Sequence, residues 1–420
     1  MAPSADLIAI LLVLAACVAT INHRFIGLPR AIALLLASLG VSALITVVDP
    51  FLTFDISGWI RGMLGAAAPP EVLLHLVLGL LLFAASLHVD LTELRRQKLT
   101  VLALATASVI IATIVFGGGV WALFQLAGSP IELRWCMVLG ALLAPTDAVV
   151  IDALLRRAAL PSTLKTAIAG ESLFNDGVGV VLFQIMLRLA QGEHGLIGHG
   201  QVAFAMAVEG LGGGGLGWGT GYIAAFVMRR VNEPGLRLLI SLALVTGTYR
   251  LADVIGLSGP TAVVACGLVL RMQAPRDANG HSLVGEVTAF WHVVDELLNA
   301  LLFVLIGFEL FAINLARVVF LPLIGALPLA LFSRFIGVIL PRGLVLHGSR
   351  PEQWRGAALL TWAGMRGGVS IALALTLPPS PYRGRLIVVC YAVVVFSMLV
   401  QGLTMSWVIR RLYGTRGDTA

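Results

Sequence analysis

Charged side chains are scarce in this sequence. Asp, Glu, Lys and Arg make up 12% of the 420 residues, whereas 59% of the residues are hydrophobic. A soluble domain carries about 25% charged residues and is about half apolar. One water-facing globule cannot bury so much apolar surface, which excludes an ordinary soluble domain. Lipid must surround most of the chain, so we expect an all-α integral membrane protein.

Cysteine and metal-binding patterns are scarce as well. The eight histidines show no HExxH spacing, and no nucleic-acid signature accompanies the net charge of +6, because the basic residues sit in short loops. The four cysteines lie in apolar runs without CxxC spacing, which predicts small core residues and no disulfide framework: Cys17, Cys136, Cys266 and Cys390.

Long apolar runs fill the chain instead. A helix needs about 20 apolar residues to cross the hydrocarbon core, and we count about 13 candidate spans. The segment 54–68 is too short and mixed to span, so we expect it at a membrane interface. No soluble domain is predicted, and residues 1–420 form one membrane domain. The spans are 5–21, 31–48, 70–88, 100–124, 134–155, 163–190, 200–228, 236–251, 255–271, 292–313, 317–341, 354–377 and 384–409.

The basic residues divide unevenly between the two sets of loops. The loops after odd-numbered spans and the C-terminal tail hold 19 of the 28 Lys and Arg residues, and the opposite loops hold seven. Positive charge gathers in cytoplasmic loops. We therefore expect the N-terminus outside, the C-terminus in the cytoplasm and an odd number of spans.

Five ionisable residues lie well inside the predicted spans. A charge at the bilayer centre costs about 2.5–3.5 kcal/mol on insertion scales, so each one needs a reason. If all are ionised, they leave one net negative charge, which suits one monovalent cation, and the same carboxylate can instead take a proton. They are Asp147, Glu171, Asp176, Arg334 and Arg366.

Asp147 and Arg366 stand beside helix-breaking sequence. Pro145 has no N–H and breaks its helix near mid-span, which exposes carbonyls that suit cation coordination beside Asp147. Glycines around Arg366, in residues 364–368, indicate a second interrupted helix. The plainer alternatives are a kinked helix that Asp147 caps, and glycines that serve packing alone.

The two breaks are seven spans apart. An odd offset reverses the orientation of a helix, as inverted-topology repeats require. We therefore expect inverted repeats over roughly residues 1–190 and 230–410.

The sixth span carries four polar residues within about one turn. Positions four apart share a helix face, so Ser172 and Asp176 form one oxygen-rich face, and Glu171 and Asn175 form its neighbour. A hard cation prefers such oxygen ligands. Arg334 cannot lose its proton and needs an acid partner, for which Glu171 is the candidate, unless Arg334 snorkels to an interface.

Glycines also cluster in the seventh span, at residues 212–215, 217, 219 and 221. Glycines at this density let helices approach closely. We expect tight packing here, with a hinge as the alternative.

The chain resembles the monovalent cation:proton antiporter-1 family, of the bacterial NhaP type. The resemblance runs through nearly all spans and is strongest in three stretches. These are Ala144-Pro145-Thr146-Asp147, Gly170-Glu171-Ser172 with Asn175-Asp176, and Gly364-Met365-Arg366-Gly367-Gly368.

The resemblance implies a core bundle of six helices, a dimerisation domain and a homodimer in the cell (inner) membrane. It implies that Asp176 alternately carries the ion and the proton, with Ser172, Asp147 and the Thr146 carbonyl as further Na+ ligands. Glu171 and Arg334 would form a core ion pair. An Asn-Asp pair, here Asn175-Asp176, is typical of one-for-one exchange. No cofactor is implied.

The chain departs from the family pattern in its third span. Many relatives place a glutamate there in a Leu-Phe-Glu pattern, whereas this chain has Leu82-Phe83-Ala84. The alternatives to Na+/H+ exchange are K+/H+ exchange by the same machinery and, in other classes, a cation channel or a membrane enzyme.

Overall fold

The computed structural model describes residues 3–51, 55, 58, 62, 70–88, 91–147, 160–192, 199–231, 233–273, 285–308, 319–341 and 350–414. Within these ranges every regular element is helical. Most of the segment 54–68, expected at an interface, lies outside the described residues.

The described residues form the following helices. They are α1 (Pro3–Ile21), α2 (Arg30–Val48), α4 (Pro70–His88), α5 (Leu91–Arg96), α6 (Lys98–Ala103), α7 (Val109–Leu126), α8 (Leu133–Leu143), α10 (Ser162–Ala190), α11 (His199–Met228), α12 (Pro234–Val254), α13 (Gly259–Met272), α14 (Gly285–Phe308), α15 (Phe320–Ile339), α17 (Arg350–Ala363), α18 (Gly368–Leu375), α19 (Arg383–Phe396) and α20 (Gly402–Tyr413). Single π-helical turns interrupt three runs, at η1 (Asn22–Ile26), η3 (Leu104–Ser108) and η7 (Ser397–Gln401).

Each predicted span overlaps at least one of these helices. Among the described residues, eight helices are long and apolar enough to cross a membrane, or nine if α17 and α18, bent by 46°, count as one span. Shorter apolar helices lie at Val77–His88, Leu133–Leu143 and Gly259–Met272. The prediction of an all-helical, multi-spanning membrane protein is confirmed, and the number of 13 crossings stays a prediction.

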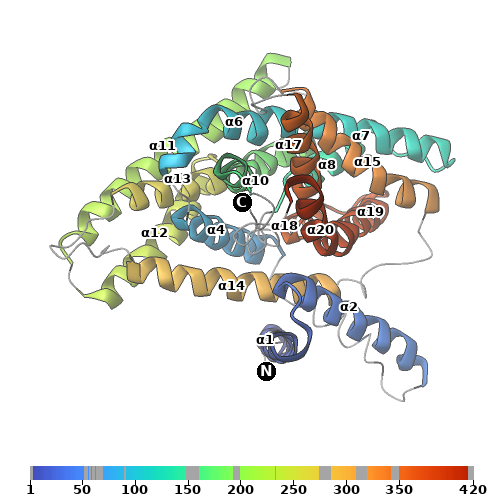
Figure 1. Cartoon of the computed structure of the whole chain (residues 1–420), viewed down its shortest axis with the longest axis horizontal. Helices are drawn as coiled ribbons and strands as arrows, with labels where there is room; N and C mark the ends of the chain where they lie inside the picture. The colour runs from blue at the N-terminus through green and yellow to red at the C-terminus, as the bar shows by residue number, and fades with distance from the viewer. Residues whose placement is uncertain are drawn as a thin grey trace.

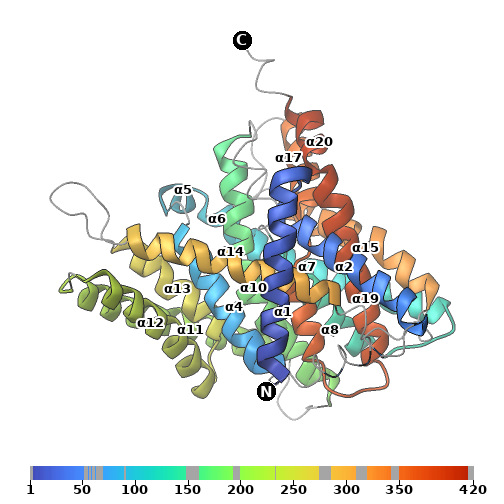
Figure 2. The same ribbon diagram turned by 90° about the horizontal axis from the view of Figure 1, so that it is seen from below.

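Helix α10 lies in the middle of the molecule. It contacts α8 and η3, and also α11 and α13. Figure 1 shows α11, α12 and α13 to one side of α10, and α7, α15 and α19 to the other. In Figure 2, α1 begins at one edge of the molecule and α20 ends at the opposite edge. The polar residues of α10 therefore sit at the centre of the helical bundle.

The glycines of α11 form its contact with α13. Gly213, Gly217 and Gly221 recur every fourth residue and are buried. A Cβ added at Gly217 would lie 1.9 Å from the Ala262 carbonyl oxygen, and one at Gly213 would lie 2.5 Å from the Ser258 carbonyl oxygen. The glycines serve close packing, and α11 is continuous from His199 to Met228, which gives no support to a hinge.

One sequence expectation about cysteine is wrong. Cys136, Cys266 and Cys390 are buried, but Cys17 is exposed. Its helix α1 lies at the edge of the bundle, with 17% of its apolar window buried, so most of its side chains face outward. An apolar residue in a peripheral span faces lipid, and hydrophobicity alone does not distinguish that position from the core.

The α11–α13 contact predicts the effect of a single methyl group. Gly217→Ala places a carbon against backbone, which cannot move aside, and we expect a loss of about 1–3 kcal/mol of stability. Gly219→Ala is the matched control, because a Cβ there meets nothing within 4 Å. Thermal unfolding in detergent should show a lower midpoint for the first variant only. Equal midpoints would contradict the packing role.

Candidate ion-binding site

Two non-helical segments, here called the first and the second break, meet at the centre of the molecule. Helix α8 ends at Leu143 and residues 144–147 are not helical, while α17 and α18 are separated by residues 364–367. The Asp147 N–H donates to the Met365 carbonyl at 2.8 Å. The Arg366 guanidinium donates to the carbonyls of Ala144 at 2.6 Å and Pro145 at 2.9 Å. Each break therefore satisfies backbone groups that the other leaves without helical partners.

Glycines of the second break leave room for two of the charged side chains. A Cβ at Gly367 would lie 1.9 Å from the Asp147 Oδ2, and a Cβ at Gly364 would lie 2.5 Å from the Arg334 Nε. Any larger residue would displace a charged group. These two glycines therefore fix how closely the breaks approach the site.

The π-helical turn η7, between α19 and α20, hydrogen-bonds to the second break. The Arg366 N–H donates to the Ser397 hydroxyl at 2.9 Å, and this hydroxyl donates to the Gln401 amide oxygen at 2.6 Å. The Gln401 Nε2 in turn donates to the Trp362 carbonyl at 3.0 Å. Side chains of η7 thus bond to backbone just before the break, at Trp362, and within it, at Arg366. Sequence analysis did not single out these residues, because a lone Ser and Gln in an apolar run carry no recognisable spacing.

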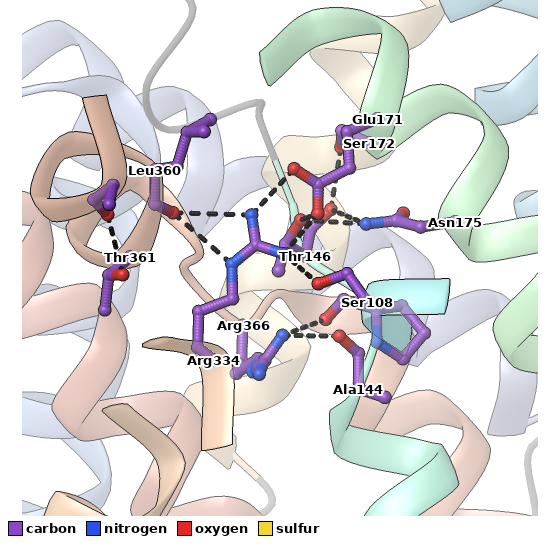
Figure 3. Close-up of polar contacts among 12 residues, drawn as sticks. Ser108, Ala144, Thr146, Glu171, Ser172, Asn175, Arg334, Leu360, Thr361 and Arg366 are labelled. Atoms are coloured by element: carbon purple, nitrogen blue, oxygen red, sulfur yellow. Dashed lines mark hydrogen bonds and ion pairs between the residues drawn. The ribbon is translucent and has the colours of Figure 1, made fainter. Parts of the chain in front are cut away.

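Glu171 and Arg334 form a buried ion pair between α10 and α15. Both guanidinium Nη atoms donate to the carboxylate, with Nη2 2.7 Å from Oε2 (Figure 3). The residues are 1% and 3% exposed. Arg334 also donates to the Leu360 carbonyl at 3.3 Å and to the Ser108 hydroxyl at 3.4 Å. Arg334 does not snorkel to an interface, and the pair neutralises itself inside the bundle.

Thr146 connects the first break to α10. Its carbonyl accepts from the Ser172 hydroxyl at 2.7 Å, and its own hydroxyl accepts from the Asn175 Nδ2 at 2.8 Å (Figure 3). A weaker contact of 3.4 Å joins the Thr146 hydroxyl to the Glu171 carboxylate. The Asn175 Oδ1 is buried and has no hydrogen-bond partner among the residues that the structure describes. The site thus holds an amide oxygen that a polar guest could satisfy.

Asp147 and Asp176 complete the cluster. Asp147 stands in the first break against Gly367, and Asp176 is half-buried on α10, one turn after Ser172. If both carboxyl groups are ionised, their negative charges repel each other. Arg334 and Arg366 both bond elsewhere, and within the described residues neither bonds to Asp176. The arrangement can therefore accept a positive guest, because repelling carboxylates are relieved when a cation or a proton binds between them.

The structure brings all the predicted site residues together around the two breaks. Outside this cluster, α14 carries one further partly buried ionisable residue, Asp295, which sequence analysis missed. Its signal was available as spacing, because His292, Asp295 and Asn299 fall three and four residues apart on one helix face. Ala84, in the third predicted span, is fully buried on α4.

A multi-spanning helical bundle with two crossed helix breaks beside buried carboxylates has the construction of a secondary ion transporter. Residues 11–411 match the family described as sodium/hydrogen exchanger, transmembrane, and the chain belongs to this family. It is therefore a transporter and not an enzyme.

Relatives and solved structures agree with this family. The chain is 37% identical to the Na(+)/H(+) antiporter NhaP of Pseudomonas aeruginosa, over 97% of both chains. It is 32% identical to the Na(+)/H(+) antiporter NhaH of Halobacillus dabanensis, over 81% of this chain and 83% of that relative. Its fold matches the sodium proton antiporter MjNhaP1 from Methanocaldococcus jannaschii with a TM-score of 0.77 and 20% identity, over 97% and 98% of the two chains.

The buried ion pair predicts unequal single and double variants. Glu171→Leu or Arg334→Met alone leaves a buried charge without its partner, which costs about 3–5 kcal/mol. The double variant removes both charges, so we expect it to recover much of that stability. Thermal unfolding in detergent measures all three.

The exposed pair Arg250–Asp253, at 3.7 Å, supplies the control. Arg250→Gln should shift stability by no more than about 1 kcal/mol. A double variant as unstable as the sum of the two single variants would show that Glu171 and Arg334 do not act as a unit.

Proposed function

We propose that this chain exchanges Na+, or Li+, for protons, with Asp176 binding either the cation or the proton. Asp147, Ser172 and the Thr146 carbonyl supply further ligands for the cation, and Asn175 supports them. The observation that carries this proposal is the oxygen-rich cluster at the crossing of the two breaks, whose two neighbouring arginines bond elsewhere. Competition for one carboxylate couples the two fluxes.

The charges around the breaks favour one-for-one exchange. Glu171 and Arg334 neutralise each other. The charge of Arg366 offsets one of the two remaining carboxylates, Asp147 and Asp176, which leaves one negative charge at the centre. A single Na+ or a single proton cancels it. A site that is neutral with either guest crosses the apolar barrier at far lower cost than a bare carboxylate, so both loaded states exchange and the empty one does not.

The choice of Na+ over K+ rests on the relatives. The proteins named above are Na(+)/H(+) antiporters, and nothing among them favours K+. A channel would not need the competition that one shared carboxylate provides.

The contact between the two breaks also suggests which parts of the protein move during exchange. We infer inverted repeats over roughly residues 1–190 and 230–410, since the two breaks meet each other across the core. The core bundle then moves against a scaffold formed by a homodimer. The protein lies in the cell (inner) membrane with its N-terminus outside and its C-terminus in the cytoplasm. The ion gradient drives the exchange, so no cofactor is required.

Asp176→Asn should abolish exchange. The amide keeps the size of the side chain but can neither be neutralised by Na+ nor carry the proton, so we expect a loss of at least about 100-fold in rate. The measurement is Na+-driven proton flux in proteoliposomes, followed with a pH-sensitive dye. Asp253→Asn is the control, because Asp253 is an exposed carboxylate paired with Arg250. This variant should keep the proton flux of the wild type. Undiminished flux in Asp176→Asn would refute the assignment of the carrier.

One-for-one exchange also predicts indifference to voltage. If each cycle moves one Na+ against one proton, an imposed membrane potential should change the initial rate by less than about 20%, because no net charge crosses. The same liposomes tested with Na+, Li+ and K+ in turn give the selectivity. A rate that rises steeply with voltage would overturn the stoichiometry, and flux with K+ alone would overturn the proposed ion.

A further inference from the structure

Asp295 is a membrane-embedded carboxylate that the exchange site does not use. It lies within α14 and is half-buried. Its Oδ1 accepts a hydrogen bond from the Asn299 Nδ2 at 3.0 Å, and the same Nδ2 lies 2.9 Å from the Asp295 carbonyl. Asn299 is buried, whereas Asp295 is partly exposed. The two hydrogen-bonded side chains therefore extend over one turn of α14 from the surface into the interior.

The same face of α14 leads to the crossing of the breaks. Asp295, Asn299, Leu302 and Ile306 follow one another at intervals of three and four residues, which places them on one stripe. Leu302 and Ile306 pack on Gly368, where an added Cβ would lie 2.2 Å from Leu302 and 3.2 Å from Ile306. The stripe thus ends at the second break.

The charge of Asp295 interacts with that of Asp147 in the proposed site. Gly367, the neighbour of Gly368, is the residue against which Asp147 stands. The carboxylates of Asp295 and Asp147 repel each other. A cation near Asp295 is therefore attracted by both groups at once, and so by the site that Asp147 shares with Asp176.

The other end of the stripe lies at the surface of the molecule. His292, one turn before Asp295, is exposed, and its ring lies edge-on to that of His88 on α4, with centroids 5.5 Å apart. His292 attracts the Asp295 charge, and Glu296 repels it. Glu296 is bonded to Arg30 at 2.7 Å, with both side chains well exposed, which largely cancels its own charge. Of these two acids, Glu296 is thus paired with an arginine at the surface, whereas among the described residues Asp295 bonds to the neutral amide of Asn299.

We propose that Asp295 is a positioning residue that draws the monovalent cation from water to the Asp147–Asp176 site along the His292–Asn299 face of α14. The inference rests on the proposed exchange function and deepens it. The His88 and His292 ends of α4 and α14 adjoin the arginine-rich loops expected in the cytoplasm. Asp295 therefore serves access from that side only, and Asp176 remains the carrier.

Asp295→Asn tests this through the sidedness of the apparent KM. A carboxylate on an access route raises the local cation concentration without touching the carrier. Na+-dependent proton flux is measured in everted membrane vesicles, which present the cytoplasmic face, and in right-side-out vesicles. We expect the KM for Na+ to rise by about fivefold to tenfold from the cytoplasmic face, and to stay unchanged from the other face, with the maximal rate retained.

Two variants separate this role from damage to the fold. Asp295→Glu keeps the charge and should restore the low KM. Glu296→Gln, at the adjacent position, should leave the KM within about twofold on both faces, since its charge is already paired at the surface. The effect of Asp295→Asn should also shrink at high ionic strength, which a purely structural defect would not do.

The proposal fails if Asp295→Asn leaves the KM unchanged on both faces, raises it equally on both, or lowers only the maximal rate. Each of these results would be obtained with wild-type exchange intact, so they overturn the access role and leave the proposed function standing. Absence of exchange in the wild-type chain would instead overturn the proposed function.

Discussion

Inside a membrane no water is available to satisfy a broken helix, and this constraint orders the centre of the molecule. The first break leaves the carbonyls of Ala144 and Pro145 without helical donors, and the guanidinium of Arg366 supplies them. The second break leaves the Met365 carbonyl, which accepts from the Asp147 N–H. Because Arg366 serves carbonyls, it is not engaged by Asp176. In the proposed exchange, the Asp176 carboxylate is therefore not neutralised by the fixed charge of Arg366 and can bind a transported cation.

The buried ion pair has a complementary role. Arg334 bonds to both oxygens of Glu171 and also to the Leu360 carbonyl, so in the proposed exchange Glu171 does not compete with Asp176 for Na+. The Thr146 hydroxyl donates to the Glu171 carboxylate. The backbone carbonyl of the same residue accepts from the Ser172 hydroxyl. Glu171 thereby helps hold Thr146 in the non-helical conformation that exposes its carbonyl. A neutral pair at this position orients the ligands and leaves the central charge balance to Asp147, Asp176 and Arg366.

Much of this arrangement could be anticipated from the sequence because breaks and buried charges leave local signals. Pro145 cannot continue a helix, the glycines at 364–368 do not favour one, and an arginine in mid-span needs an acid. Asp295 escaped notice because it lies among Glu286, His292 and Glu296, where it resembles the polar start of a helix. Its burial depends on packing against other helices. The bracing of Arg366 by Ser397 and Gln401 likewise depends on a contact between distant segments, which spacing along one helix does not reveal.

The same bonds constrain how the site can move. Three hydrogen bonds join the two breaks directly: Asp147 to Met365, and Arg366 to Ala144 and to Pro145. A fourth joins the helices beside them, from the Ser370 hydroxyl of α18 to the Leu142 carbonyl of α8 at 2.9 Å. Leaving any of these groups unpaired in an apolar interior costs about 1–3 kcal/mol, which opposes sliding one break past the other. The broken helices must therefore travel together with α10, which Thr146 ties to them. In the proposed exchange, alternating access then requires the whole cluster to move against the surrounding helices, with its ligands kept in place.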